Sequence, residues 1–334
     1  MEERRQEAKL IEAAPGVYRL KIPMNIQKGS VNSYLLRGAK GDWVIVDPGY
    51  FTEACLRGWE SAMEELNIRF EDISLILNTH FHGDHAGMAG WFERRCSAPI
   101  YLHPDEILSY HAEWDNDLLH VDTMVAYMSP HGLHGWRIDE LREQMARIGT
   151  ASIEVCSRFL ELQEGDSFAI EGGRLHTILA PGHSSGHCMF YCPERKLLFS
   201  GDMILPITYP PVGLRSYGDT DPIGSAIRSL DKLAEAFQDP GILCLPGHGW
   251  AIDEPAERAG AAADHFRETA QWYLERCKRE EVNAFQVAEE IASGGTKRKF
   301  HLLMSEAMAY FQYLHLQGKI TRRRGEDGLV YYGC

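Results

Sequence analysis

The sequence predicts a layered α/β fold that carries a helical insertion and a small C-terminal domain. Strand-like and helical segments alternate along residues 16–250, which is typical of β-sheets covered by α-helices. The chain has 334 residues, and a single hydrophobic core usually stops growing at about this length. We therefore expect a large domain over residues 1–264, with an inserted helical cap at about 104–159, and a small domain over residues 265–334.

The first eighty residues read as strands separated by turns and by one helix. β-Branched and aromatic residues fall between Gly, Asn and Asp, as around the turn GAKGD. The run SLILN is short and apolar, the pattern of a strand buried on both faces. Helical periodicity extends from Thr52 to Leu66. We expect strands at 16–22, 31–36, 43–50 and 74–78.

The middle of the chain continues this alternation after one interruption. A short helix is expected at 86–95, but residues 104–159 contain no β pattern and read as two or three amphipathic helices. Farther on, Asp221 is a candidate N-cap with Pro222 at the first helical position, so we expect a helix to residue 237. Strands are expected at 98–103, 174–180, 188–192, 197–202 and 241–249.

From about residue 265 the chain reads as helices followed by a hairpin. Helical patterns cover 265–280, 283–293 and 301–317, and Gly318 is a candidate C-cap. The last segment, KITRRRGEDGLVYY, turns at Gly-Glu-Asp-Gly, as a two-stranded hairpin does. Helices closed by a two-stranded wing predict a small winged-helix-like domain.

Charge and composition exclude several classes of protein. With 44% hydrophobic and 25% charged residues, the composition is that of a globular protein and excludes disorder. The net charge is −14, whereas proteins that mainly bind phosphate backbones are usually basic, so dominant nucleic-acid binding is disfavoured. Residues 266–334 hold 11 basic and 9 acidic side chains, a net +2, which leaves −16 on residues 1–265.

The sequence shows no secretory or membrane-spanning pattern. The N-terminus, MEERRQEAKL, lacks the apolar core of a signal peptide, and no run approaches the roughly 18 apolar residues of a membrane span. The eight cysteines are scattered and mostly lie inside apolar runs, without a C-x-x-C motif. We therefore expect a cytoplasmic protein with reduced, buried thiols and no membrane partner.

The strongest chemical signal is the segment Asn78-Thr79-His80-Phe81-His82-Gly83-Asp84-His85, directly after the buried strand SLILN. Four potential metal ligands lie within six residues at the end of a strand, where a loop can fold them inward. Imidazole nitrogens and carboxylate oxygens are natural ligands for Zn²⁺ and also suit iron and manganese. A single loop histidine is usually only an exposed side chain, but three histidines and a carboxylate at this spacing indicate a metal site.

Three further strand ends carry side chains of the same kind. His183 and His187 follow one strand in the segment Pro-Gly-His-Ser-Ser-Gly-His, Asp202 ends the next, and His248 follows Pro-Gly after the last. Taken alone, Asp202 reads as a turn residue and His248 as a loop residue. Because α/β sheets tend to place their sites at the C-terminal ends of strands, we expect these side chains to meet.

Together these motifs resemble the metallo-β-lactamase superfamily. The family pattern of H-x-H-x-D-H, a later His after Pro-Gly, an Asp after Ser-Gly and a final Gly-His occurs in order over residues of about 14–250. The resemblance implies a four-layer αββα sandwich and a site for two divalent metal ions, zinc with iron or manganese as alternatives. It implies one ion bound by His80, His82 and His183, a second bound by Asp84, His85 and His248, and Asp202 shared by both.

The resemblance also implies supporting residues and a reaction. Asp47 and His187 would orient the ligands. An Asp at the shared position and a His at the last position look like the glyoxalase II-type branch. Two metal ions can activate a shared water and polarise a substrate oxygen. We therefore expect a metal-dependent hydrolase that cleaves an acyl compound, such as a thioester, ester or lactone, with Asp84 as the catalytic residue.

The walls of the substrate pocket are harder to predict. The cap supplies many apolar side chains, and we expect Met124, Tyr127 and Met128 to line the pocket together with Tyr209 from the loop after Asp202. Packing of the cap onto the sheet is the simpler explanation of the cap residues. The expected partner is a small-molecule acyl substrate, and the sequence leaves open whether the chain forms a homo-oligomer.

Two other activities remain open. The C-terminal segment of residues 265–334, which we call the tail, resembles the C-terminal domain of a lactamase-like group that includes an RNA endonuclease. Its segments 297–299 and 322–324 are basic. Against a nuclease stands the net −16 of the large domain, which would repel a polyanion. Mononuclear-iron persulfide dioxygenases share the fold and the ligand types. The complete set of ligands disfavours a purely binding role.

Overall fold

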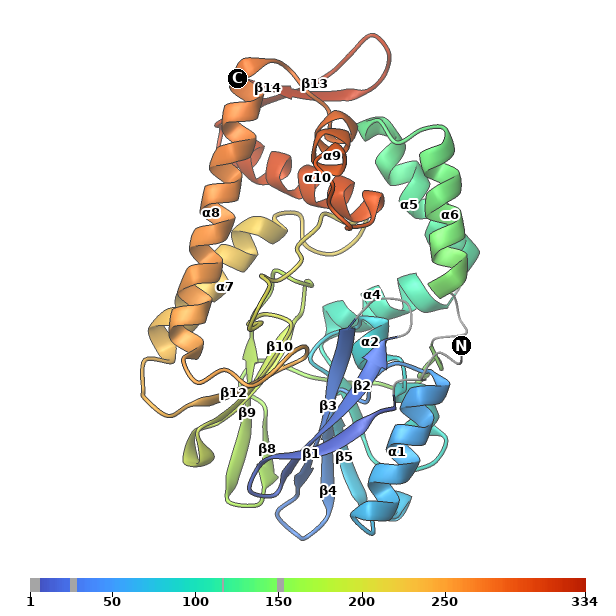
Figure 1. Ribbon diagram of the computed structural model, residues 1–334, viewed down its shortest axis with the longest axis vertical. Coiled ribbons are helices and arrows are strands. Elements are labelled where there is room, and N and C mark those ends of the chain that lie inside the picture. Colours follow the sequence, from blue (N-terminus) through green and yellow to red (C-terminus); the bar gives the residue numbers. More distant parts are fainter. Residues whose placement is uncertain (1–6, 25–28, 116, 149–152) are drawn as a thin grey trace.

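Two β-sheets pack face to face, and helices cover the outer face of each sheet (Figure 1). The computed structural model describes residues 7–24, 29–115, 117–148 and 153–334. The charged N-terminal residues 1–6, and residues 116 and 149–152 of the predicted cap, lie outside the described residues. The layered α/β fold that the sequence predicts is confirmed.

The first sheet has seven strands, in the order β1-β2-β3-β4-β5-β6-β7. Neighbours are antiparallel from β1 to β4 and parallel from β4 to β7. The sequence pattern does not predict β1, because this edge strand is mostly exposed and shows no apolar alternation. The strands are β1 (Lys9–Ala14), β2 (Val17–Met24), β3 (Gly29–Arg37), β4 (Trp43–Val46), β5 (Ile73–Leu77), β6 (Ile100–Leu102) and β7 (Leu160–Glu161).

The second sheet has five strands, in the order β12-β11-β10-β9-β8. Strands β8 to β11 are antiparallel neighbours, whereas β12 runs parallel to β11. Parallel pairing places the ends of β11 and β12 side by side, with Gly201 opposite Pro246. The strands are β8 (Ser167–Ile170), β9 (Gly173–Leu179), β10 (Cys188–Cys192), β11 (Leu197–Gly201) and β12 (Leu243–Pro246).

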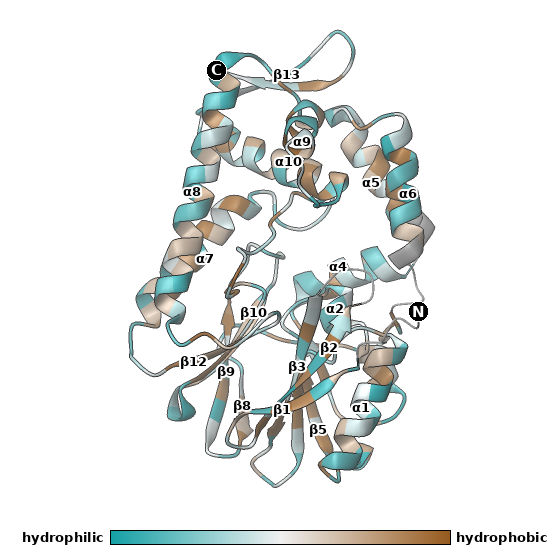
Figure 2. Cartoon of the chain, in the orientation of Figure 1, coloured by the Kyte–Doolittle hydropathy of each residue, from teal (hydrophilic) through white to brown (hydrophobic). Residues whose placement is uncertain are grey.

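Three hydrophobic clusters hold four layers together. Between the sheets, the ring of Tyr34 on β3 lies 5.2 Å from that of Phe199 on β11. Outside the first sheet, Trp59 of α1 (Glu53–Glu65) packs edge-on against Phe92 of α3 (Ala89–Glu93). Outside the second sheet, α7 (Pro222–Ala236) and α8 (Pro255–Arg279) enclose a third cluster. Apolar residues accordingly concentrate in the strands (Figure 2). The predicted αββα sandwich is therefore present.

In the first 250 residues, the helices begin where the sequence indicates, with one exception. Thr52 caps α1 by accepting a hydrogen bond from the N–H of Cys55, and Asp221 caps α7 in the same way. The helix predicted at 86–95 is instead divided into α2 (Gly83–Ala86) and α3, because the N–H of Met88 bonds to the carbonyl of Gly49. The remaining helices of this part are α4 (Pro104–Trp114), α5 (Asp117–Met128), α6 (Trp136–Ile148) and the 3₁₀ turns η1 (Phe70–Asp72), η2 (Ser129–His131) and η4 (Pro193–Arg195).

Residues 265–334 contain most of α8, then two further helices and a hairpin, in the predicted order. Gly318 follows the end of α10 with φ of +67°, and its N–H bonds to the carbonyl of His315. Helix α8 begins at Pro255 and passes without a break through the predicted boundary at residue 264. The two-domain division and the winged-helix assignment stay predictions. The elements are α9 (Ala284–Ser293), α10 (Phe300–Leu316), β13 (Thr321–Arg324) and β14 (Val330–Gly333).

The helical cap rests on the tail. Met128, Leu133 and Leu141 of the cap are buried in one cluster with residues of α9 and α10. Arg137 on α6 forms an ion pair with Glu289 on α9 at 2.6 Å. In Figure 1, α5 and α6 accordingly stand beside the tail, above the two sheets. The tail therefore supports the cap that lies over one end of the sandwich.

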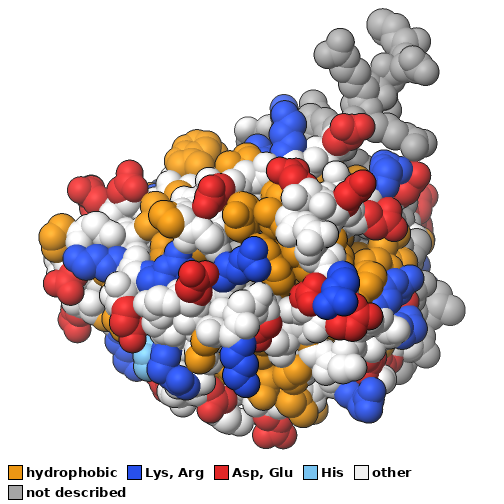
Figure 3. Space-filling model, turned by 90° about the horizontal axis from the view of Figure 1, so that it is seen from below, with side chains coloured by type: hydrophobic (Ala, Val, Ile, Leu, Met, Phe, Trp, Pro, Cys, Tyr) orange, Lys and Arg blue, Asp and Glu red, His pale blue; other side chains and the backbone are white. Residues whose placement is uncertain are grey.

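The surface and the cysteines match the composition. All eight cysteines are free thiols and six are buried, as the sequence predicts. Within the described ranges, no helix combines the length and apolarity needed to cross a bilayer. On the face shown in Figure 3, acidic and basic side chains are interspersed with apolar ones, so neither charge sign dominates there.

Candidate metal centre

Seven side chains converge where strands of both sheets end. Their donor atoms form three groups, each within 4.8 Å: His80, His82 and His183; His80, His85 and Asp202; Asp84, His85 and His248. Four of these residues follow β5, namely His80, His82, Asp84 and His85. The other three, His183, Asp202 and His248, follow β9, β11 and β12 respectively. The structure thus brings together all seven residues that the sequence selects as metal ligands.

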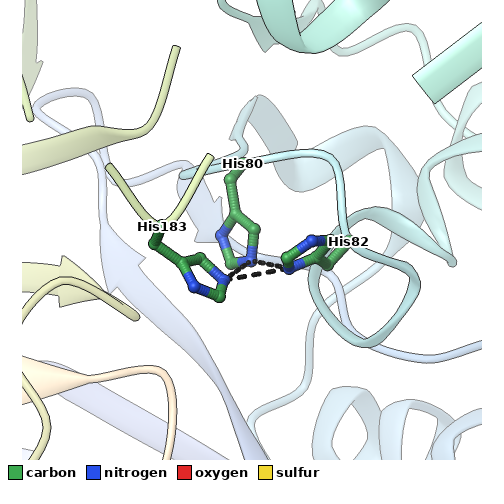
Figure 4. A group of neighbouring side chains, drawn as sticks. All are labelled: His80, His82 and His183. Atoms are coloured by element: carbon green, nitrogen blue, oxygen red, sulfur yellow. Dashed lines mark hydrogen bonds between the residues drawn. The ribbon is translucent and has the colours of Figure 1, made fainter. Parts of the chain in front are cut away.

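Three histidines form one half of this centre, which we name the three-histidine half (His80, His82 and His183). Their rings point toward one another (Figure 4). His82 Nδ1 lies 3.0 Å from His80 Nε2 and 2.9 Å from His183 Nε2, and those two Nε2 atoms are 3.3 Å apart. Three nitrogens at these separations can all contact one ion.

The other half, which we name the carboxylate half, consists of Asp84, His85 and His248. Asp84 Oδ2 lies 3.3 Å from His248 Nε2 and 3.9 Å from His85 Nε2. Asp202 reaches both halves, since its Oδ2 lies 3.6 Å from His183 Nε2 and 3.4 Å from His248 Nε2. Asp202 therefore occupies the place expected for a ligand shared by two ions.

Asp47 positions two of the histidines. Its Oδ2 accepts hydrogen bonds from His85 Nδ1 at 2.9 Å and from the hydroxyl of Thr79 at 2.8 Å. The same hydroxyl lies 2.9 Å from His80 Nδ1. Asp47 itself has φ of +55°, a backbone conformation that is uncommon outside glycine. These contacts suit the orienting role predicted for Asp47.

His187 and two backbone carbonyls position the remaining ligands. His187 Nε2 accepts the backbone N–H of Asp202 at 3.1 Å, so His187 supports Asp202 and does not join the donor groups. The Nδ1 atom of His183 lies 2.7 Å from the carbonyl oxygen of Pro211, and that of His248 lies 2.8 Å from the carbonyl oxygen of Ser30. Each ring is thereby turned with Nε2 toward the centre.

The donor atoms fit divalent metal ions. His85 Nε2 and Asp202 Oδ1 are buried, lie 3.4 Å apart and have no hydrogen-bond partner among the described residues. Unpaired buried polar atoms are costly, and a cation satisfies both at once. A Cβ at Gly247 would collide with Asp202 Oδ1, which explains the glycine before His248. Imidazole and carboxylate donors suit zinc, iron or manganese.

The two halves hold protons differently. Burial and the neighbouring imidazoles keep the pKa of His80 and His82 well below the usual value, so these rings are neutral. Burial also opposes charge on His85, but Asp202 and Asp84 outweigh it and raise its pKa to about 10. Asp202 and Asp84 likewise raise the pKa of His248 well above the usual value, although burial opposes this. Protons should therefore compete with a metal ion more strongly in the carboxylate half than in the three-histidine half.

Glu106 is a supporting residue that the sequence analysis missed. It lies on α4, is fully buried, and accepts the N–H of Phe81 at 2.9 Å and the N–H of Gly186 at 2.6 Å. Phe81 separates two ligands, and Gly186 precedes His187, so one carboxyl group ties two ligand loops together. Burial raises the pKa of Glu106 to about 7. No pattern marks this residue, because an acidic residue in a first helical turn ordinarily interacts with the helix dipole.

A second missed group lies beside His82. Arg215, in the loop after Asp202, places Nη2 2.8 Å from His82 Nε2 and Nη1 2.7 Å from Glu113 Oε2. The hydroxyl of Tyr217 donates to the same Glu113 oxygen at 2.7 Å. These residues lie on a loop and a helix that are distant in sequence, so no local motif connects them.

The predicted pocket residues contact other parts of the chain. Tyr209 stacks on His265 of α8 at a ring distance of 4.1 Å, and the guanidinium of Arg258 lies 4.4 Å from the centre of the Tyr209 ring. Met128 is buried in the cluster that joins cap and tail, and Met124 and Tyr127 pack against it. Their role in lining a substrate pocket stays a prediction.

Comparison with known proteins points to one family. The model of the metallo-beta-lactamase superfamily matches residues 26–248. A solved structure of a metallo-beta-lactamase family protein from Thermus thermophilus, TTHA1429, aligns with a TM-score of 0.79 and 28% identity, over 96% of this chain and 99% of that one. The fold therefore extends over nearly the whole of both chains.

Curated relatives are more distant in sequence. The probable metallo-hydrolase YqjP of Bacillus subtilis is 23% identical over 95% of this chain and 97% of its own length. The hydroxyacylglutathione hydrolase GloC of Haemophilus influenzae is 26% identical over 61% of this chain and 79% of its own. An atrochrysone carboxyl ACP thioesterase of Pseudocercospora fijiensis is 27% identical over 66% of this chain and 48% of its own.

Proposed function

The chain belongs to the metallo-β-lactamase superfamily, and from that premise we propose that it is a hydrolase that uses two zinc ions to cleave an acyl thioester or a related ester or lactone. The position of Asp202 carries this proposal, because its carboxylate reaches His183 on one side and His248 on the other. One carboxylate between two sets of donors favours two ions over one.

The residues of such a site would have different roles in metal binding and in orienting a water molecule. When bound, the two ions supply a water activated at neutral pH and a Lewis acid for the substrate carbonyl. The neutral rings of the three-histidine half offer free lone pairs, and the carboxylate half offers negative charge. The side chain of Asp84 is 20% exposed, so its carboxylate can also orient a water molecule and accept a hydrogen bond from it. Asp84 is therefore the proposed catalytic residue.

The choice of a thioester rests on relatives and on charge. Two relatives are named as a thioesterase and as a hydroxyacylglutathione hydrolase, and a hydroxyacylglutathione is an acyl thioester. A nuclease would need exposed basic groups free to meet phosphates. In the tail, Arg298 pairs with Glu306 and Arg323 pairs with Glu281, so part of each basic segment is already neutralised. The net −16 of residues 1–265 opposes a polyanion as well.

Metal analysis together with a substrate panel tests this proposal. The protein is purified without added metal, its metals are counted, and it is assayed on thioesters, lactones and single-stranded RNA. About two zinc ions per chain with thioester cleavage support the proposal. One iron per chain would favour a persulfide dioxygenase instead, and cleavage of RNA alone would replace the acyl hydrolase with a nuclease.

A further inference from the structure

Arg215 is held in place beside the three-histidine half from several directions. Its neighbour Leu214 is tied to α10, since Leu214 N–H donates to the carbonyl of Ser305 at 3.0 Å and the Ser305 hydroxyl donates back at 2.8 Å. The Nη1 atom of Arg215 pairs with Glu113, whose side chain is only 9% exposed. The side chain of Arg215 is 34% exposed. A guanidinium is thus fixed next to the metal ligands while part of it remains open to solvent.

The contact between Arg215 and His82 places two donors face to face. His82 directs Nδ1 toward the other two histidines of its half, so this nitrogen is the one that can bind metal. A neutral imidazole that binds metal through Nδ1 carries its proton on Nε2. Arg215 Nη2 is also a donor, and it lies 2.8 Å from that Nε2. Two N–H groups cannot hydrogen-bond to each other, so both need an acceptor.

His82 differs in this respect from the other four described ligand imidazoles. The outer nitrogens of His80, His85, His183 and His248 each lie against an oxygen, from a hydroxyl, a carboxylate or a backbone carbonyl. Metal-binding histidines almost always donate their second N–H to such an oxygen. The outer nitrogen of His82 instead faces the Arg215 cation, and no acceptor for it lies among the described residues that contact His82.

One oxygen can satisfy both donors. An atom at about 2.9 Å from each of two nitrogens that are 2.8 Å apart forms a nearly equilateral triangle with them. A carboxylate suits this place because guanidinium–carboxylate pairs are short, strong and often bidentate. The net −16 of residues 1–265 favours a singly charged group over a phosphate.

We propose that Arg215 Nη2 and His82 Nε2 together bind a carboxylate of the substrate, which makes the substrate an acyl compound with a free carboxylate. This inference rests on the proposed acyl hydrolase function and narrows its substrate class. The carboxylate can belong to the acyl part or to the thiol part of a thioester. Glu113 balances the charge of Arg215 and holds Nη1, leaving Nη2 for the substrate.

Three thioesters distinguish the two sources of the carboxylate. The neutral reference is the butanoyl thioester of 3-mercaptopropanamide. The succinyl monothioester of the same thiol adds a carboxylate on the acyl side, and the butanoyl thioester of 3-mercaptopropanoate adds one on the thiol side. For the protein loaded with two equivalents of zinc, kcat/KM should be at least about tenfold higher for one charged ester than for the neutral one. In Arg215→Met, this ratio should fall to near one.

A binding measurement tests the site without relying on turnover. Calorimetric titration of the zinc-loaded protein with succinate should give a Kd that rises at least about tenfold in Arg215→Met. The Glu113→Gln variant should change Kd in the opposite direction, because it leaves the charge of Arg215 unbalanced. Arg228→Met is the matched control, since Arg228 pairs with Asp221 and its side chain is 63% exposed, and it should change neither Kd nor the ratio. Metal content is measured for every variant.

The outcomes separate this inference from the proposed function. If the wild type cleaves thioesters but shows no preference for a carboxylate, the inference is wrong and the hydrolase proposal stands. If it cleaves none of them while succinate binding still depends on Arg215, the carboxylate site stands and the hydrolase proposal fails. Equal succinate affinity in the wild type and in a metal-replete Arg215→Met protein overturns the carboxylate site.

Discussion

The two halves of the metal centre contain similar atoms in opposite electrostatic states. In the three-histidine half, burial and mutual repulsion keep the pKa of His80 and His82 low, and the rings are neutral. In the carboxylate half, Asp84 and Asp202 raise the pKa of His85 to about 10, and that ring is protonated. The difference arises from which partners the fold places within about 4 Å, since all five histidines belong to the same residue type.

This difference has a consequence for metal binding. The three-histidine half is ready to bind an ion, because lone pairs need no deprotonation. The carboxylate half attracts a cation more strongly only after His85 and His248 have lost their protons. Asp202 couples the two halves because it contacts ligands of both. We therefore expect the two ions to respond differently to pH and to substitutions near one half.

Removing the carboxylate of Asp202 should have the largest effect on metal content and activity, because Asp202 contacts ligands of both halves. Asp202→Ala should reduce bound metal in both halves and lower kcat/KM at least about 100-fold, since even residues that only support metal ligands typically contribute 10–100-fold. Metal analysis and a thioester assay measure the two effects. Asp264→Ala, a surface carboxylate whose side chain is 72% exposed, should change neither. Full activity of Asp202→Ala would show that this residue is not a shared ligand.

Removing a residue that supports only one half should lower the affinity for one ion more than for the other. Asp47→Asn loses the charge that holds His85 Nδ1 at 2.9 Å, so we expect the ion of the carboxylate half to bind about 10–100-fold more weakly. The ion of the three-histidine half should be less affected, because Asp47 reaches His80 only through Thr79. Competition with a chromophoric chelator resolves the two affinities. An equal loss at both ions would contradict the separation.

As the pH falls, metal should be lost first from the carboxylate half and only at lower pH from the three-histidine half. Protons compete with metal at His85 and His248, whose pKa values are raised, so the affinity of the carboxylate half should fall as pH drops. The neutral rings of the three-histidine half should keep their ion to lower pH. Metal per chain after equilibrium dialysis at pH 5.5 and pH 8, about one and about two ions respectively, checks this expectation. Loss of both ions at the same pH would refute it.

The smallest expected effect concerns the support of the ligand loops. Glu106→Gln keeps the size of the side chain but replaces one accepting oxygen with an NH₂ group, so one of the N–H groups of Phe81 and Gly186 loses its acceptor. We expect about 1–3 kcal/mol lower stability, seen as a lower midpoint in urea. Glu60→Gln, an exposed residue on α1, serves as the control. An unchanged midpoint would mean that the two loops hold their positions without Glu106.

Local patterns were sufficient to predict most of the fold. Buried strands such as β5 and β11 are apolar throughout, and caps such as Thr52 and Asp221 mark helix starts, so these elements follow from short stretches of sequence. Strand β1 was missed because an exposed edge strand has no burial pattern to reveal it. The start of α8 was placed about ten residues too late, because Pro255 looks like a break when it actually occupies the first turn.

By itself, the sequence predicted which side chains gather in the candidate metal centre, because their motifs follow apolar strands of both sheets and resemble those of one family. Only the tertiary structure decided what surrounds those ligands. Glu106, Glu113 and Arg215 reach the centre from α4 and from a distant loop, through contacts that span 25 to 133 positions along the chain. Protonation states and the acceptor that His82 lacks depend on such contacts, since electrostatic interactions follow distance in space and not position in sequence.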